Sequence, residues 1–248
     1  MWDRLRDKLA GRLWSWRIYH LLFADYSFLD SIFKAPLLRN YLGSHAGRTL
    51  DYGCGGGTYT DLIRTRATVL IAADVQYNGL QRLARRHRRH SNVLPLVCSA
   101  TALSLAGNSL DTVLCLEVLE HLPEGEDQRC LREFARLLRR GGKLILSTPV
   151  PPGYVDDLSK NPYGHRREGY GMEDLSAMLT QTGFVIQRYE YRFFKIYKAF
   201  YRFIHRFFER WGFYPPSALV LPALLDFWYI RQGADGQPGN LLLFAVRA

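Results

Sequence analysis

The sequence has few cysteines, and this shortage limits the chemistry that they could serve. Its four cysteines are Cys54, Cys98, Cys115 and Cys130, and no pair has the C-x-x-C spacing of zinc and redox sites. Cys98 and Cys115 lie within apolar runs, which favours buried, reduced thiols over disulfides. We therefore expect a cytoplasmic protein without a zinc site.

Long uninterrupted apolar stretches are also missing. The longest apolar run, residues 218–230, contains Pro222 and Asp226 and falls short of the ~20 residues that a membrane span needs. Residues 1–14 lack the apolar centre of a signal peptide. These observations predict a cytoplasmic protein, either soluble or bound peripherally at the inner face of a membrane.

Acidic residues are outnumbered by basic ones. The 248 residues include 33 Lys+Arg and 23 Asp+Glu, which gives a net charge of +10, and the hydrophobic content of 48% suffices for one sizeable core. A basic surface suits an anionic membrane, a nucleic acid or an acidic substrate.

Apolar runs and helical patterns alternate at short intervals through residues 48–150, which is typical of a doubly wound parallel sheet in an α/β protein. The expected strands are residues 48–52, 69–73, 93–98, 111–116, 143–147, 184–192 and 241–246. The expected helices between them are residues 58–66, 77–90, 126–139 (closed by Gly141 and Gly142) and 172–182. Two further helices, 2–23 and 28–42, the second broken near Pro36, would form an amino-terminal segment of residues 1–44. The main domain would be residues 45–248, with a helical insert at 193–238.

Four glycines within residues 53–57 directly follow the first expected strand, in the stretch LDYGCGGG. Glycines there let the backbone approach a ligand at the carboxyl end of a strand. Asp74 ends the second expected strand, where an acidic side chain can accept both hydroxyls of a ribose. The alternative is a simple turn that precedes a helix, beside a surface carboxylate.

Four motifs in order resemble those of the class I S-adenosylmethionine-dependent methyltransferases: LDYGCGGG, Asp74, DTVLCLEVLEHL and LRRGGKLILSTP. The resemblance covers roughly residues 45–192 and 240–247. It implies a Rossmann-like sheet of seven strands, one of them antiparallel, and S-adenosylmethionine as cofactor. It assigns the following residues to the cofactor: Asp51, Gly53, Cys54, Gly55, Gly57, Asp74, Val75, Ser99, Ala100, Thr101, Leu116 and Glu117.

Two details bear on that assignment. Many relatives carry Asp where Ser99 stands, so adenine recognition would depend more on the backbone of Ala100 and Thr101. A nicotinamide-dependent dehydrogenase would normally show G-x-G-x-x-G, whereas this loop continues as GGGTYT.

The segment EVLEH at residues 117–121 resembles ubiquinone-pathway O-methyltransferases and small-RNA 2′-O-methyltransferases. In those families the two Glu and the His bind a divalent ion, which implies Glu117, Glu120 and His121 as ligands of Mg²⁺, Mn²⁺ or a similar ion. The alternative is that the segment shapes the cofactor pocket without a metal.

The stretch NPYGHRREGYGMEDL, residues 161–175, is expected to return over the same pocket. His165 is a candidate general base, and Glu120 and His121 complete the catalytic candidates. Tyr163, Glu168 and Tyr170 would position the acceptor. The alternative is a structural histidine that joins the loop to the core.

Residues 193–211, FFKIYKAFYRFIHRFFERW, predict a helix with an aromatic face and a basic edge. Residues 193–230 would contact a membrane, or form a lid over an apolar tunnel. The continuous apolar face disfavours nucleic acid. The sequence therefore predicts methyl transfer to a hydrophobic acceptor, such as a lipid-, quinone- or polyprenyl-like molecule. The alternatives are an RNA or tRNA methyltransferase and a non-catalytic interaction protein with the same fold.

Overall fold

The computed structural model describes residues 26–99, 103–151, 164–192, 225 and 238–248, with side chains from residue 34 onward. Packing of the Cα atoms divides the chain into two compact units, residues 1–34 with 193–237 and residues 35–192 with 238–248. Nearly all described residues belong to the second unit. The predicted helix at 2–23 and almost all of the insert at 193–238 lie outside the described residues, and the predicted boundary at residue 44 stays a prediction.

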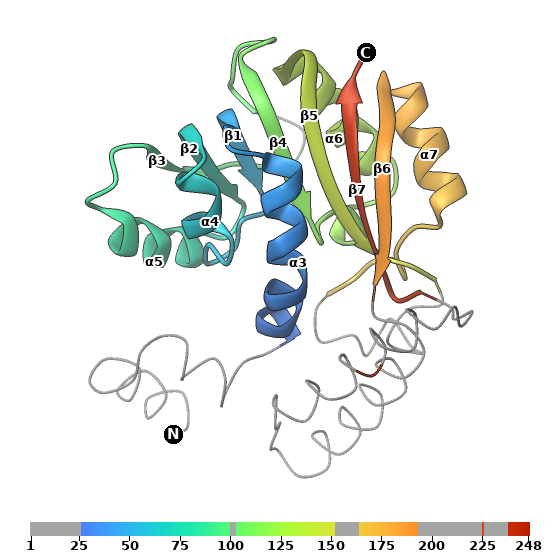
Figure 1. Cartoon of the computed structure of the whole chain (residues 1–248), viewed down its shortest axis with the longest axis horizontal. Coiled ribbons are helices and arrows are strands. Elements are labelled where there is room, and N and C mark those ends of the chain that lie inside the picture. Colours follow the sequence, from blue (N-terminus) through green and yellow to red (C-terminus); the bar gives the residue numbers. More distant parts are fainter. Residues whose placement is uncertain (1–25, 100–102, 152–163, 193–224, 226–237) are drawn as a thin grey trace. The chain divides into compact units, whose positions relative to one another are not determined.

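The second unit is built on one seven-stranded sheet with the strand order β3-β2-β1-β4-β5-β7-β6 (Figure 1). Strand β7 pairs antiparallel with both β5 and β6, whereas the pairs among β1 to β5 are parallel. This topology confirms the predicted α/β fold with one antiparallel strand. The strands are β1 (Gly47–Tyr52), β2 (Ala67–Asp74), β3 (Val93–Val97), β4 (Leu110–Leu116), β5 (Leu138–Pro149), β6 (Phe184–Arg192) and β7 (Asn240–Arg247).

Helices cover both faces of this sheet, so successive residues of its central strands are buried on opposite sides. Leu144 and Leu146 of β5 join the core cluster that α6 and α7 complete, whereas Ile145 joins the cluster of α3 and α4. Burial on both faces explains the nearly continuous apolar runs of these strands. The helices are α3 (Tyr26–Leu42), α4 (Thr60–Arg64), α5 (Tyr77–His87), the short 3₁₀ helix η1 (Leu119–His121), α6 (Glu126–Leu137) and α7 (Met172–Gln181).

Two local predictions were wrong. Helix α3 runs through Pro36 without the expected break. The missing N–H of proline removes one helical hydrogen bond, and the complete burial of Leu38 and Leu42 opposes that cost. Likewise, Gly141 does not close α6. Leu138 already has an extended backbone and pairs with Leu110, so the two glycines lie in an irregular part of β5.

None of the helices in the described part of the chain has the length and hydrophobicity of a transmembrane span. The predicted cytoplasmic or peripheral location is not tested by this observation and stays a prediction.

Candidate functional site

The strand order reverses between β1 and β4, and the glycine loop (residues 53–57) follows β1 at this point. Ligands of doubly wound folds bind at the carboxyl ends of the strands beside such a reversal. The N–H groups of Gly53 and Cys54 both donate to the carbonyl oxygen of Ala73, at 2.8 and 3.0 Å. The loop is therefore fixed to the end of β2 by its own backbone.

Packing and backbone conformation explain only some of the glycines in this loop. Gly53 and Gly57 have φ of 72° and 83°, and a Cβ on either would collide with a neighbouring side chain, Val118 and Leu83 respectively. Gly55 also has a positive φ of 52°, whereas neither packing nor a positive φ requires a glycine at Gly56; a Cβ on either residue would meet nothing within 4 Å. The open space beside these two residues is what a ligand that approaches the backbone requires.

The first turn of α5 supports the loop from outside. A Cβ on Gly79 would lie 2.8 Å from the carbonyl oxygen of Gly55, so helix and loop approach backbone to backbone. The sequence around Gly79 did not predict this role, because the contact joins Gly79 to Gly55, which lies 24 positions earlier in the chain.

Asp74 lies at the end of β2 and is 9% exposed. One carboxylate oxygen accepts from the N–H of Gly55 at 2.7 Å, and the other accepts from the N–H of Gln76 at 2.8 Å. A carboxylate has about four acceptor positions, so two hydrogen bonds leave capacity for ribose hydroxyls. The next residue, Val75, is 69% exposed, as expected of an apolar side chain that would contact an adenine ring.

Asp51 is the most unusual carboxyl group at the site. It is 3% exposed, and burial together with the negative charge of Asp74 raises its pKa from 3.8 to about 7. Among the described residues, no basic side chain contributes to its ionisation. A buried carboxylate that lacks a positive partner is costly unless a ligand supplies the positive charge.

Three other cofactor candidates among the described residues lie at the same edge of the sheet. Cys54 and Leu116 are buried, and Ser99 is exposed after β3. Burial and the carboxylates of Asp51 and Asp74 raise the pKa of the Cys54 thiol, which keeps it neutral. Ala100 and Thr101 lie outside the described residues.

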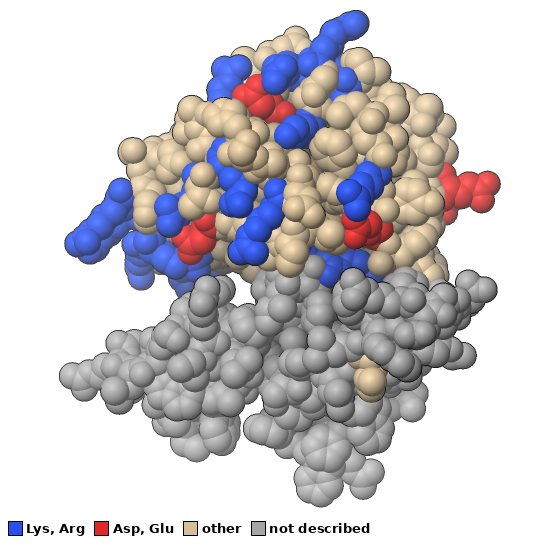
Figure 2. Space-filling view, in the orientation of Figure 1, with Lys and Arg blue, Asp and Glu red and all other residues tan. Residues whose placement is uncertain are grey.

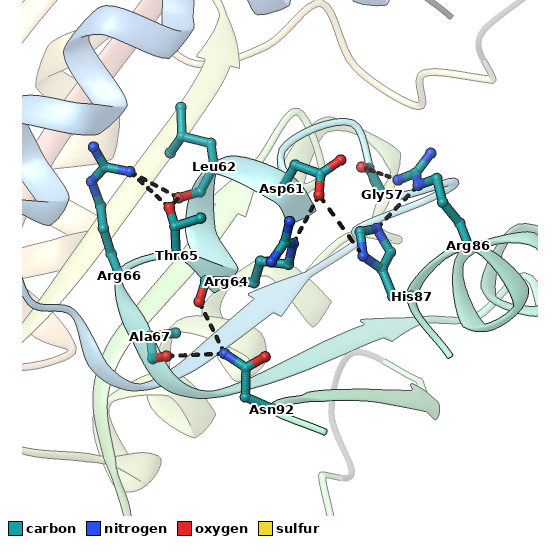
Figure 3. A network of polar contacts seen from close by, with 10 residues as sticks. All are labelled: Gly57, Asp61, Leu62, Arg64, Thr65, Arg66, Ala67, Arg86, His87 and Asn92. Carbon is teal, nitrogen blue, oxygen red and sulfur yellow. Dashed lines mark hydrogen bonds and ion pairs between the residues drawn. The ribbon is translucent and has the colours of Figure 1, made fainter. Parts of the chain in front are cut away.

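A polar network links the far side of the glycine loop to α4 and α5 (Figure 3). Arg86 donates through Nη2 to the carbonyl oxygen of Gly57 at 2.7 Å and through Nε to Nε2 of His87 at 3.0 Å. His87 is buried, and its Nδ1 lies 3.9 Å from the Asp61 carboxylate, which also pairs with Arg64. Arg86 thus holds the loop from the surface of α5.

Glu117 directly follows β4 and has an unfavourable φ of 57° for a non-glycine residue. Its carboxylate accepts from Ser147 Oγ at 2.6 Å and from Asn240 Nδ2 at 2.9 and 3.0 Å. Asn240 is completely buried at the start of β7. These contacts hold Glu117 in place from two neighbouring strands, β5 and β7.

The potential metal ligands differ in part from the predicted set. Single ligand atoms of Glu120, His121 and His165 lie within 4.8 Å of one another, and Glu117 does not belong to this group. The rings of His121 and His165 meet edge to face with centroids 4.6 Å apart. Burial and the neighbouring imidazole lower the pKa of His165 to about 4, so it is neutral at pH 7.

The return of residues 164–170 to the site is set by contacts at the backbone and at α6. Arg166 N–H donates to the carbonyl oxygen of Glu120 at 2.9 Å. Tyr170 was predicted to position the acceptor, but it is buried and donates to Asp127 at 2.7 Å. Arg167 pairs with the same carboxylate at 2.7 Å. Tyr170 therefore anchors the loop, while Tyr163 lies outside the described residues.

Residues 50–146 match the family model described as a methyltransferase domain. This part of the chain is therefore similar to S-adenosylmethionine-dependent methyltransferases. A probable S-adenosylmethionine-dependent methyltransferase of Mycobacterium tuberculosis is 35% identical over 140 residues, which are 55% of this chain and 48% of that protein. A ubiquinone biosynthesis O-methyltransferase of Xanthomonas euvesicatoria is 38% identical over 154 residues, which are 56% of this chain and 63% of that protein.

The matched part of the chain thus covers about half of the first relative and about three fifths of the second. The crystal structure of an S-adenosylmethionine-dependent methyltransferase from Mesorhizobium loti is similar, with a TM-score of 0.63. The match covers 88% of this chain and all of that one at 19% identity. At this identity the similarity concerns the fold, and it agrees with the topology of the sheet.

Proposed function

We propose that this protein transfers a methyl group from S-adenosylmethionine to a hydrophobic small-molecule acceptor. The observation that carries the proposal is the pair of buried carboxyl groups, Asp51 and Asp74, beside a glycine loop whose Gly55 and Gly56 face open space. Asp51 lacks a positive partner among the described residues, and Asp74 keeps free acceptor capacity. This set fits a ligand that is cationic at one end and carries a ribose at the other.

S-adenosylmethionine supplies a methyl group that is already activated on a sulfonium. Asp51 and the loop N–H groups would hold the methionine part, Asp74 would accept from the ribose hydroxyls, and Val75 would contact the adenine. Ionised Asp51 would stabilise the positive charge of the bound cofactor. The remaining task of the protein is to align the acceptor and to exclude water.

On the acceptor side, His165 would accept the proton of an acceptor hydroxyl, because a neutral imidazole offers a lone pair for that step. His121 lies against His165, and its Nδ1 is 3.4 Å from the carbonyl oxygen of Gly164. Glu120 is completely buried, so its role would be to orient the two histidines rather than to touch the acceptor.

A divalent ion at Glu120, His121 and His165 is the alternative to a base at His165, because the lone pair of His165 would then bind the ion. One carboxylate and two imidazoles favour a transition-metal ion such as Mn²⁺, Fe²⁺ or Zn²⁺ over Mg²⁺. An ion held there would lower the pKa of an acceptor hydroxyl. Titration of the protein with Mn²⁺ and with Mg²⁺, on the wild type and on His165→Ala, tests it: equal affinity of both proteins for Mn²⁺ excludes the site.

The acceptor class rests on similarity. Relatives include proteins named ubiquinone biosynthesis O-methyltransferase, whose name implies a hydrophobic aromatic acceptor. The net charge of +10 keeps RNA as the alternative acceptor. A non-catalytic protein on the same fold would not need an uncompensated buried carboxyl group at Asp51.

Calorimetry with S-adenosylhomocysteine tests the cofactor assignment. We expect micromolar binding by the wild type and at least a tenfold loss in Asp74→Asn. Radiolabelled S-adenosylmethionine, incubated with the protein and either a cell lipid extract or total RNA, then identifies the acceptor class. Absence of cofactor binding by the wild type would contradict the whole proposal, whereas label in RNA alone would contradict only the acceptor.

A further inference from the structure

One long segment of the chain carries positive charge and no negative charge. Residues 75–110 contain no Asp or Glu, although they include five arginines. These arginines are Arg82, Arg85, Arg86, Arg88 and Arg89, and all five are exposed on α5 and the turn that follows it. The net charge of the protein is therefore concentrated in part at one place on its surface.

The opposite face of α5 packs inward through Gly79, Leu80, Leu83 and His87. Figure 2 shows Lys and Arg side chains gathered at the lower left of the described part, where Figure 1 places α5. The nearest acidic neighbour on α4, Asp61, pairs with Arg64 and His87. Within the described part of the chain, no ion pair involves Arg82, Arg85, Arg88 or Arg89. We call these four residues the α5 surface.

A solvated helix end does not account fully for this arrangement. Basic residues near a helix carboxyl terminus interact favourably with the last carbonyl groups, but like charges three or four residues apart repel each other. Arg82 with Arg85, and Arg85 with Arg88 and Arg89, have these spacings. An anionic partner would remove the repulsion.

The surroundings of the α5 surface favour a membrane over a nucleic acid. The edge strand β3 packs beside α5 and leaves Leu94 and Val97 48% and 54% exposed. Aliphatic side chains next to arginines suit the boundary between headgroups and acyl chains. Single-stranded RNA is bound through several stacked aromatic rings, and Tyr77 is the one aromatic residue in α5 and β3.

We propose that the α5 surface binds the anionic phospholipid headgroups of a membrane. Arginines near an anionic leaflet attract its surface, and four of them on α5 and the turn that follows it match the number that such recognition uses. The proposal deepens the proposed function, since it rests on a lipid-like acceptor that resides in the membrane. Arg86, which lies on the same helix, donates a hydrogen bond to the carbonyl oxygen of Gly57, so α5 directly contacts the glycine loop.

Vesicle sedimentation with the full chain tests this inference. The variant Arg85→Gln/Arg88→Gln/Arg89→Gln is compared with Arg39→Gln/Arg132→Gln/Arg140→Gln, in which three exposed arginines elsewhere are replaced. Both variants lose the same charge. We expect wild type to bind phosphatidylcholine vesicles that contain phosphatidylglycerol and not pure phosphatidylcholine vesicles. At about fivefold per arginine, the α5 variant should bind about a hundredfold more weakly, and the control should bind within a few fold of wild type.

Three outcomes would overturn the proposal: no binding of wild type to anionic vesicles, an equal loss in both variants, or release of wild type from vesicles by substoichiometric RNA. The affinity for S-adenosylhomocysteine, measured on the same three proteins, should stay constant. Because cofactor binding is a separate readout, failure of docking is distinguishable from failure of the proposed function.

Discussion

Replacing Asp51 by Asn should stabilise the free protein and at the same time weaken cofactor binding. The folded protein keeps the Asp51 proton up to about pH 7, whereas the unfolded chain releases it near pH 3.8. Between these values the unfolded state binds fewer protons, so the free energy of unfolding falls as the pH rises. The change is ~1.4 kcal/mol for each pH unit, which gives about 4 kcal/mol over the whole window.

The assay is urea unfolding of wild type and Asp51→Asn at about pH 5 and about pH 7. All other titrating groups are shared, so their contributions cancel in the difference between the two proteins. The wild type should lose roughly 2 kcal/mol relative to the variant between these two pH values, because the slope falls to half where the pH reaches the folded pKa of about 7. The buried side-chain amide of the Asp51→Asn variant needs a hydrogen-bond partner of its own. A missing partner would reduce the variant's gain in the free energy of unfolding by ~1–3 kcal/mol.

Cofactor binding should respond in the opposite direction. Without a negative charge at residue 51, affinity for S-adenosylmethionine should fall at least tenfold at pH 8, where the wild-type carboxyl group is ionised. If the free energy of unfolding changes with pH in the same way in both proteins, burial does not raise the pKa of Asp51. Equal cofactor affinity would refute the role that we assign to the charge.

Three further substitutions test contacts around the site. Gly79→Ala places a methyl group against the backbone of the glycine loop, so it should lower the free energy of unfolding in urea by ~1–3 kcal/mol and also lower cofactor affinity. The control Gly56→Ala, whose added methyl group meets no atom, should leave the free energy of unfolding unchanged. Asn240→Leu leaves Glu117 without two donor contacts and should cost ~1–3 kcal/mol in thermal unfolding; an unchanged melting temperature would count against the network. Tyr170→Phe should cost ~1–2 kcal/mol of stability through the lost hydrogen bond on α6, with cofactor affinity retained; a selective loss of turnover would restore Tyr170 as an acceptor contact.

The strands β2, β4, β5 and β7 were predictable because each contains a short apolar run between polar residues, and the order of motifs along the chain agreed with the sheet that formed. The end of α6 was not predictable. Two glycines after a helix usually mark its end. Here, however, Leu138 pairs with Leu110, so the strand β5 begins three residues before the first glycine, Gly141. A hydrogen bond to a distant strand outweighed a local signal.

The sequence alone determined the residues that we assign to the cofactor, because the glycine loop, Asp51 and Asp74 take their positions from the carboxyl ends of β1 and β2. Only the tertiary structure decided the partners of the acidic and imidazole groups beyond β4. Glu117 is held by Asn240, which lies 123 positions away, and His121 meets His165 from a separate loop. Spacing along the chain gives the location of a side chain, but the groups that surround it, and hence its charge and direction, are set by packing between distant segments.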